Sequence, residues 1–431
     1  MKNIPKLRFP EFQNAPEWEE KKLIDIANFI NEKIALNKLT LNNYISTENL
    51  LQDFSGVSVS SKLPDVKTVT HFKINDILIS NIRPYLKKVW SATFDGGASN
   101  DVIVARAKES TNNNFLTYIL KNEEFINYVM QGAKGVKMPR GDIALIKKYP
   151  LYISTKPKEQ QKIADCLSSL DELILAQSEK AEALKTHKKA LMQQLFPSVA
   201  ELVEAKNIPR LRFPEFKDAP EWEEQKIDDI GKIITGNTPS TSQSEYYGGN
   251  KLFVSPADIS DNRYITTTKT TLTECGFLET RQIEANSILF VCIGSTIGKI
   301  AQNKYICATN QQINSIIPSK EYCNDFIYSL LENNYSKITL LVGNHAVPII
   351  NKTIFSSIKV LIPLLEEQQK IADCLSSLDE LILAQSEKVE ALKTHKKALM
   401  QQLFPNQNKD DTMLLHTKQE AKASLPKNEQ V

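Results

Sequence analysis

One 39-residue segment occurs twice in this chain, and this repeat limits the possible folds more than any other feature. It runs from Glu159 to Pro197 and again from Glu367 to Pro405, 208 residues later. The two copies differ at one position, where Ala181 in the first is Val389 in the second. We call these segments the helix repeats. A chain that carries nearly the same long segment twice is expected to contain two equivalent structural supports.

A second, shorter repeat precedes each helix repeat. Residues 3–23 return as residues 207–227 with 16 of 21 positions identical, and we call these segments the lead-in repeats. Between each lead-in and its helix repeat lies an insert, residues 24–156 in the first half and residues 228–362 in the second. The two inserts look unrelated at first reading. This order predicts two different recognition modules held in structurally equivalent positions. Together they would recognise one target at two places.

The helix repeats have the pattern of a coiled coil. Ten positions of the first copy are spaced alternately four and three apart, eight of them are apolar, and a proline follows the last one. A helix of 39 residues is about 58 Å long, too long to be buried in one small domain. We expect the two helices to pair antiparallel, with Gln177 and Ala181 near Gln385 and Val389. The alternative is an ordinary amphipathic helix packed on its own insert. The predicted seam consists of Ile163, Leu167, Leu170, Ile174, Ala181, Leu184, Leu191, Leu195, Ile371, Leu375, Leu378, Ile382, Val389, Leu392, Leu399 and Leu403.

The bulk composition is that of a globular protein of two or three domains. The chain has 431 residues, of which 41% are hydrophobic and 24% are charged. It contains no apolar run near the roughly 18 residues that span a membrane, and the N-terminal residues lack the apolar stretch expected of a signal peptide. We therefore expect a cytoplasmic protein without membrane contact. The six Cys form no CxxC pair and the five His have no metal-ligand spacing, so neither disulfides nor a metal site are expected.

Charge is distributed unevenly between the inserts. Residues 24–150 carry 16 Lys and Arg against 12 Asp and Glu, whereas residues 228–358 carry 10 against 11. Neither insert is as basic as a protein that binds DNA alone through phosphates. If the target is nucleic acid, another subunit must supply much of the positive charge.

The inserts share a skeleton of apolar positions. At a constant offset of 211, residues 75–78 align with 286–289 and residues 115–122 with 326–333, and residues 98–100 match 308–310 with a one-residue shift. In both inserts this pattern predicts strands, a helix, a glycine-containing loop and a short strand that enters the long helix. The helices are expected at about 114–131 and 325–342, and the short strands at 143–153 and 354–362. One fold with two specificities would have this pattern.

Candidate contact residues are the polar positions at which the inserts differ. Lys and Arg can donate to guanine edges and phosphates, and amide side chains match adenine edges. For each residue the alternative is an ordinary surface or turn residue. The candidates in the first insert are Arg83, Lys87, Lys88, Asn100, Lys134, Lys137 and Arg140. Those in the second are Ser295, Thr296, Lys299, Asn310, Gln311, Gln312, His345 and Asn351.

The sequence contains no recognisable catalytic motif. Residues 294–299 (GSTIGK) lack the spacing of a phosphate-binding loop, and we interpret them as a turn between strands. Neither a GxGxxG motif nor a Pro-Pro dipeptide occurs, which excludes the Asn-Pro-Pro-aromatic motif of adenine methyltransferases. Trp18 and Trp222 belong to the lead-in repeats and are expected to pack in the core. We therefore assign no catalytic residue.

Together these features resemble the specificity (S) subunit of a type I restriction–modification system. The resemblance is carried by EQQKIADCLSSLD at 159–171 and 367–379, by EWEE at 17–20 and 221–224, and by the turn at 294–299. It covers the chain as far as Pro405.

The resemblance implies an α+β fold. Two pseudo-repeated, mixed α/β globular target recognition domains are each followed by a long helix, and the two helices pair as an antiparallel coiled coil. The implied domains are 1–156 with its lead-in 1–23, the first spacer helix 157–197, 198–362 with its lead-in 207–227, and the second spacer helix 363–405. Residues 406–431 are polar and lack aromatic side chains, so we expect a disordered tail.

For function, the resemblance implies that each recognition domain reads half of a split double-stranded DNA sequence. Two methyltransferase (M) subunits would dock on the helices and use S-adenosylmethionine, and restriction motor-nuclease (R) subunits would use ATP with Mg. This chain itself would bind no cofactor. Half-sites one duplex turn apart lie about 34 Å from each other, a separation that the paired helices could set.

Two other functions stay open from the residues. The chain could be a protein-binding coiled-coil assembly scaffold without sequence-specific DNA readout, which the weak charge of the second insert favours. A stand-alone nuclease or methyltransferase would need the motifs that are absent.

Overall fold

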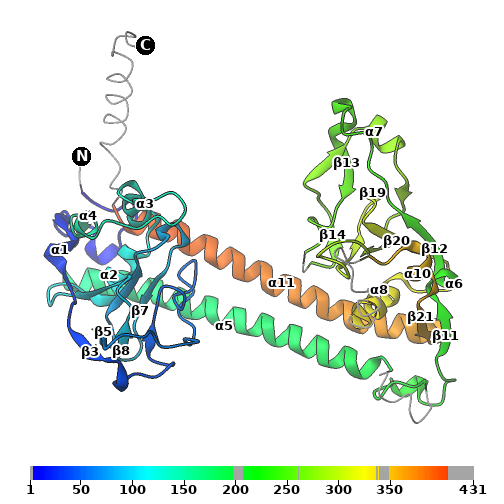
Figure 1. Cartoon of the computed structure of the whole chain (residues 1–431), viewed down its shortest axis with the longest axis horizontal. Coiled ribbons are helices and arrows are strands. Elements are labelled where there is room, and N and C mark those ends of the chain that lie inside the picture. The colour runs from blue at the N-terminus through cyan, green and yellow to red at the C-terminus, as the bar shows by residue number, and fades with distance from the viewer. Residues whose placement is uncertain (1–2, 198–206, 261, 336–337, 339–348, 406–431) are drawn as a thin grey trace, which may run out of the picture. The chain divides into compact units, whose positions relative to one another are not determined.

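The structure is a computed structural model that describes residues 3–197, 207–260, 262–335, 338 and 349–405 (Figure 1). It contains two compact units, of which unit 1 comprises residues 1–176 and 390–431 and unit 2 comprises residues 177–389. Each unit holds one insert together with part of both long helices. The tail predicted at 406–431 lies outside the described residues.

Unit 1 is built on two four-stranded sheets and one two-stranded sheet, with strand orders β2-β9-β6-β7, β3-β5-β8-β4 and β1-β10. The strands are β1 Glu19–Lys22, β2 Ala27–Phe29, β3 Lys33–Ala35, β4 Tyr44–Ile45, β5 Thr68–Phe72, β6 Ile77–Ser80, β7 Val89–Ser91, β8 Gly96–Ala98, β9 Val102–Ala107 and β10 Pro150–Ile153. The short helices are α1 Leu23–Ile26, α2 Asn113–Leu120, α3 Glu123–Gln131 and α4 Ile143–Lys147.

Unit 2 has sheets of five, four and two strands, with orders β12-β20-β17-β18-β14, β15-β13-β19-β16 and β11-β21. The strands are β11 Glu223–Lys226, β12 Gly231–Thr235, β13 Tyr247–Val254, β14 Tyr264–Ile265, β15 Thr270–Leu272, β16 Gln282–Ile283, β17 Ile288–Val291, β18 Ile300–Asn303, β19 Cys307–Thr309, β20 Ile313–Pro318 and β21 Lys359–Ile362. The short helices are α6 Ile227–Ile230, α7 Glu274–Leu278, α8 Asn324–Asn333 and α10 Lys352–Ser357.

The skeleton that the sequence predicts in both inserts is confirmed by the pairing of the central strands. In unit 1, β6 lies between β9 and β7; in unit 2, β17 lies between β20 and β18, with antiparallel neighbours in both cases. Asn75 and Asn286 precede these strands with φ of 69° and 62°, a left-handed conformation that Asn tolerates. The units differ at their sheet edges, because β14 adds a strand that unit 1 lacks among its described residues. The two units therefore share the arrangement of their central strands but differ in the strands at the edges of their sheets.

Both helix repeats form long helices, as predicted. The helix α5 runs from Pro157 to Leu195 and α11 from Leu365 to Leu403, and each has 39 residues. Each helix begins and ends two residues before the repeat does. Pro157 stands at the first helical position, where its missing N–H costs nothing.

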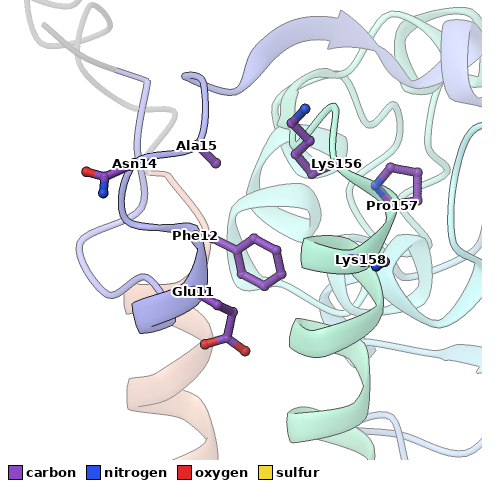
Figure 2. Close-up of a pocket in the computed structure, with 7 residues that line it drawn as sticks. All are labelled: Glu11, Phe12, Asn14, Ala15, Lys156, Pro157 and Lys158. Atoms are coloured by element: carbon purple, nitrogen blue, oxygen red, sulfur yellow. The ribbon is translucent and has the colours of Figure 1, made fainter.

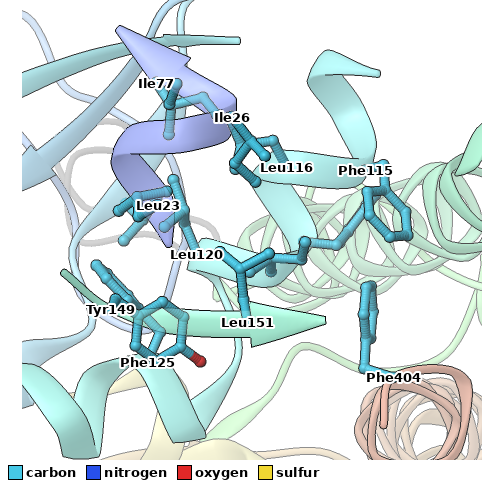
Figure 3. Packing of buried hydrophobic residues seen from close by; sticks show 14 of the residues in the cluster. Leu23, Ile26, Ile77, Phe115, Leu116, Leu120, Phe125, Tyr149, Leu151 and Phe404 are labelled. Carbon is cyan, nitrogen blue, oxygen red and sulfur yellow. The ribbon is translucent and has the colours of Figure 1, made fainter. Parts of the chain in front are cut away.

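The core of each unit joins its lead-in repeat to the two long helices. In unit 1, Trp18 packs edge-on against Phe115 and against Phe404, which follows the end of α11. Figure 3 shows Phe115 and Phe404 in this cluster. In unit 2, Trp222 packs in the same way against Phe326 and Phe196, which follows the end of α5. Both tryptophans are buried, so their predicted role in packing is confirmed.

The structure corrects two predictions about secondary structure. The single helix predicted at 114–131 is two helices, because Asn122 caps α3 by accepting a hydrogen bond from Glu124 N. In the second insert, α8 ends at Asn333, and most of the remaining predicted helix lies outside the described residues. The short strands predicted at 143–153 and 354–362 occupy only the last four residues of each range, since α4 and α10 precede them.

Candidate nucleic-acid interface

In unit 1, the candidate basic residues gather around the turn between β6 and β7. Arg83 N donates to Pro139 O at 2.7 Å, and Gly141 N donates to Asn81 O at 3.0 Å, so the loop 132–141 lies against this turn. The backbone of Arg140 also bridges that of Ile82. We call residues 81–88 together with residues 132–141 the basic surface. The structure thus brings together residues that are more than 50 positions apart in the sequence.

Several basic side chains of this surface already have acidic partners. Lys87 contacts Glu123 at 2.9 Å, Arg140 contacts Asp101 at 2.9 Å, and Lys134 lies 3.8 Å from Asp142. Hydrogen bonds from Lys87, and then from Lys397, lower the pKa of Glu123. Asn100 is exposed beside Asp101.

Three candidates stand apart from these pairs. Lys88 reaches inward and donates to Thr47 O at 2.7 Å, and burial lowers its pKa. Its role in unit 1 is therefore to hold a neighbouring loop. Lys137 is exposed, and the side chain of Arg83, which is half-buried, makes no hydrogen bond or ion pair with any described residue.

In unit 2, the candidates lie on two neighbouring turns. Ser295, Thr296 and Lys299 occupy the turn between β17 and β18, which confirms the interpretation of 294–299 as a turn between strands. The turn between β19 and β20 carries Asn310, Gln311 and Gln312. The two turns meet where Cys292 N donates to Gln312 O at 2.8 Å.

Most candidates in unit 2 take part in local structure. Asn310 Nδ2 donates to Gln312 Oε1 at 2.9 Å, and Gln311 Oε1 accepts from the Thr238 hydroxyl at 2.7 Å. Lys299 donates to Ile259 O at 2.9 Å, as Lys88 does to a carbonyl in unit 1. Asn351 caps α10 by accepting from Ile354 N. His345 lies outside the described residues.

Sequence reasoning missed exposed apolar side chains on the basic surface. Tyr85 is 48% exposed at the tip of the β6–β7 turn, and Val136 and Met138 are exposed on the adjoining loop. The sequence signal that could have identified them is an isolated apolar residue flanked by Lys, Gly or Pro. Such a residue in a basic loop cannot pack into a hydrophobic core and therefore stays exposed. They give this surface a mixed apolar and cationic character.

The repeated residues hold each unit together through matched contacts. Arg8 forms a bidentate pair with buried Glu159, and Arg212 forms the same pair with Glu367. The lead-ins also bind the ends of the long helices: Leu7 N donates to Gln402 O, and Leu211 N to Gln194 O, both at 3.0 Å. Each unit is therefore closed by the end of the helix that follows the other insert.

Each insert is fastened to the same helix positions by a different side chain. In unit 1 the Tyr118 hydroxyl contacts Ser168 at 3.2 Å and Asp171 at 2.8 Å. In unit 2 the equivalent serine and aspartate, Ser376 and Asp379, accept from Arg263 at 2.8 and 3.3 Å. The helices thus offer the same serine and aspartate to two unrelated side chains. No sequence signal identified Tyr118 or Arg263.

The predicted seam is consistent with the burial of its residues. All sixteen seam residues are buried or half-buried. Contacts join α5 to α11 within each unit, since Lys396 pairs with Asp171 at 2.5 Å in unit 1 and Lys188 with Asp379 at 2.6 Å in unit 2. Pairing over the full length of the helices stays a prediction.

A pocket of about 540 Å³ lies in unit 1 beside the start of α5 (Figure 2). The one carboxylate in its lining, Glu11, pairs with Lys162 of α5 at 3.4 Å, which lies outside the pocket. The residues that line it are Glu11, Phe12, Asn14, Ala15, Lys156, Pro157 and Lys158. Within the described residues, no helix is both long and apolar enough to cross a membrane.

Comparison with known proteins identifies the family. Residues 16–186 and 220–394 both match the type I restriction modification DNA specificity domain. The chain is 36% identical over 147 residues to the HindI specificity subunit of Haemophilus influenzae, covering 33% of this chain and 32% of that protein. It is 30% identical over 171 residues to the MjaIX specificity subunit of Methanocaldococcus jannaschii, covering 38% of this chain and 39% of that protein. The chain thus spans about a third of the length of these relatives.

A solved structure shares the fold over nearly the whole chain. The type I restriction–modification S subunit from M. genitalium has a TM-score of 0.63 at 16% identity, covering 94% of this chain and 100% of that one. Because the family domain matches twice and covers most of the sequence, this chain belongs to the type I restriction–modification DNA specificity family.

Proposed function

We propose that this chain is the non-catalytic specificity subunit of a type I restriction–modification enzyme and reads a split double-stranded DNA target. The observation that carries the proposal is the pair of inserts. They share their central strands, and they differ at the turns that follow β6 and β17. Two copies of one scaffold with different turn residues are what recognition of two different half-sites requires.

The proposed function assigns a role to each part of the chain. We propose recognition domains at 1–156 and 198–362, and spacer helices at 157–197 and 363–405. The side chains that face DNA are drawn from the candidates above, and those already used to cap a helix or hold a loop are the weakest among them. The lysines that bind backbone carbonyls, Lys88 and Lys299, are of this second kind.

The partners are two methyltransferase subunits, and the helices offer them two equivalent docking positions. Leu173 and Leu175 on α5 are 40% and 60% exposed. Their counterparts on α11, Leu381 and Leu383, are 55% and 41% exposed. Exposed leucines at the same place in two near-identical repeats fit two copies of one partner. The partners would carry S-adenosylmethionine, and the restriction subunits ATP with Mg.

The alternative function is an assembly scaffold whose inserts bind proteins. The near-neutral second insert favours it, but the turns of unit 2 present amide side chains, which are suited to adenine edges. The two functions differ in a simple measurement. Methylation assembled with this chain should be restricted to one split sequence, whereas a scaffold would leave the choice of sequence to its partners.

Methylome sequencing of the host with and without this gene tests the proposal. We expect one split motif to lose its methylation when the gene is deleted. Exchange of residues 24–156 for the insert of another family member should then change one half-site and leave the other. Loss of no motif, or a change of both half-sites after the exchange, would refute the proposal.

A further inference from the structure

The turns after β6 and β17 need the same unusual backbone but obtain it with different residues. At the offset of 211, Arg83 aligns with Gly294 and Lys87 with Gly298. All four are left-handed: φ is 51° and 54° in unit 1, and 99° and 89° in unit 2. Glycine adopts this conformation freely, whereas Arg and Lys meet a steric penalty. Unit 1 has a strained turn where unit 2 has a relaxed one.

The strain in unit 1 extends to the segment that holds this turn. Asp53 N donates to Leu86 O at 3.1 Å, and Phe54 N donates to Lys87 O at 2.9 Å. Both donors are themselves left-handed, with φ of 51° and 61°. Apart from asparagines, all non-glycine residues with positive φ in the described part of the chain lie here. Backbone strain concentrated in this way is typical of ligand-binding sites.

The position of the Arg83 side chain adds a second, independent observation. Its Nε is buried without a hydrogen-bond partner, and no carboxylate pairs with its guanidinium among the described residues. Lys87 differs, since it is paired with Glu123. Burial first, and then the charge of Arg83, lower the pKa of neighbouring Lys88, so the two cations lie near each other. The backbone of Arg83 helps to hold the loop 132–141, but its side chain makes no hydrogen bond or ion pair that stabilises this unit.

The same place in unit 2 is filled by another side chain. A Cβ added at Gly294 would lie 3.4 Å from Gln312 Nε2, so this amide occupies the space next to the glycine. Gln312 Nε2 is also 3.4 Å from Ile293 O. The two units therefore present a guanidinium and an amide at matching positions of one scaffold.

We propose that Arg83 determines the specificity of the first recognition domain by binding a guanine edge in its half-site. The inference rests on the proposed function and assigns one base contact within it. A guanidinium can donate two hydrogen bonds to guanine O6 and N7 in the major groove, and such a contact discriminates against other bases. Glycine would relieve the backbone strain of this turn, but it has no side chain that can contact a base. The strained arginine is therefore retained.

The test uses the complete methyltransferase complex assembled with this chain carrying Arg83→Gly. Methylation is measured on a pool of duplexes in which each base of the wild-type motif is varied in turn. We expect discrimination at one guanine of the first half-site to fall about ten-fold or more, while the second half-site is unchanged. The melting temperature should stay equal or rise, because glycine removes the strain.

Two further variants separate base readout from other roles. Arg83→Lys keeps the charge but loses the paired donors, so it should lose the same discrimination. Asp53→Gly relieves backbone strain at a residue with the same φ of 51°, but it removes no cationic side chain. The complex that carries this variant should therefore methylate the same motif as the wild type.

Three outcomes would overturn the inference. One is an unchanged methylation motif in Arg83→Gly. Another is a loss of methylation in Arg83→Gly that is equal on all duplexes and is restored in Arg83→Lys, which would indicate a phosphate contact. The third is a lowered melting temperature in Arg83→Gly, which would indicate a structural role. If the wild-type complex shows no split motif at all, the proposed function fails instead.

Discussion

Gln177 and Gln385, which are the same position of the two helix repeats, are hydrogen-bonded to each other. Gln385 Nε2 donates to Gln177 Oε1 at 2.8 Å and approaches Gln177 O at 3.1 Å. Gln385 is buried, so a polar pair sits within a seam whose positions are mostly apolar. Buried amides of this kind fix the register of coiled coils, at some cost in stability.

This contact gives a direct test of helix pairing. Cysteines at Gln177 and Gln385, in a background where the partly exposed native cysteines are replaced by serine, should be joined within one chain by a short bis-maleimide. Faster migration in a denaturing gel would show the bridge. The pair Glu179→Cys and Glu387→Cys, at two exposed positions of unit 2 off the seam, should not be joined. The Ala181 and Val389 pair expected from the sequence is tested in the same way. Absence of the first bridge would argue against the antiparallel pairing.

The duplicated ion pairs predict equal losses of stability. Arg8→Ala leaves Glu159 buried without its partner, and Arg212→Ala does the same to Glu367. Removing one member of a buried pair costs about 3–5 kcal/mol in unfolding free energy. We expect similar losses in the two variants by urea unfolding, each affecting its own unit. Lys185→Ala removes an exposed pair with Glu182 and should have no measurable effect. Unequal losses of unfolding free energy in Arg8→Ala and Arg212→Ala would show that the two ion pairs do not have equivalent surroundings.

The sequence predicts the repeated parts of this fold well, because they depend on local pattern. Seam spacing identifies α5 and α11, and shared apolar anchors identify the central strands of both units. The break before α3 was missed, although Asn122 followed by two glutamates is a helix-start signal. The left-handed backbone of Arg83 could be inferred only by aligning it with Gly294. The contact of Arg263 with Asp379 joins residues 116 positions apart, which no local pattern encodes.

Buried thiols predict a loss of stability at alkaline pH. Burial raises the pKa of both Cys292 and Cys307 to about 12. The folded state therefore keeps these protons when the unfolded chain has released them. The stability that this protonation contributes is complete below about pH 8.5 and is lost as the pH rises toward 12. Each pKa unit corresponds to about 1.4 kcal/mol.

The slope of unfolding free energy against pH between 9 and 11 measures this effect. The double variant Cys292→Ala and Cys307→Ala should have a shallower slope than the wild type. Cys275→Ala, which removes an exposed thiol, should leave the slope unchanged. A double variant with the wild-type slope would mean that other groups cause the alkaline loss.

The exposed leucines of the long helices predict where the proposed methyltransferase partners bind. Leu175→Lys on α5 and Leu383→Lys on α11 place a charge on a surface that is already exposed, so the fold should be unaffected. At an apolar interface the same charge must be desolvated, and binding should weaken about ten-fold or more per site. Because the sites are equivalent, each single variant should bind one methyltransferase subunit and the double variant none, as measured by the mass of the purified complex. Ala183→Lys, which adds the same single charge at an exposed position of α5 away from the leucines in sequence, is the matched charge control. A double variant that still assembles with two methyltransferase subunits would exclude these leucines as the docking positions.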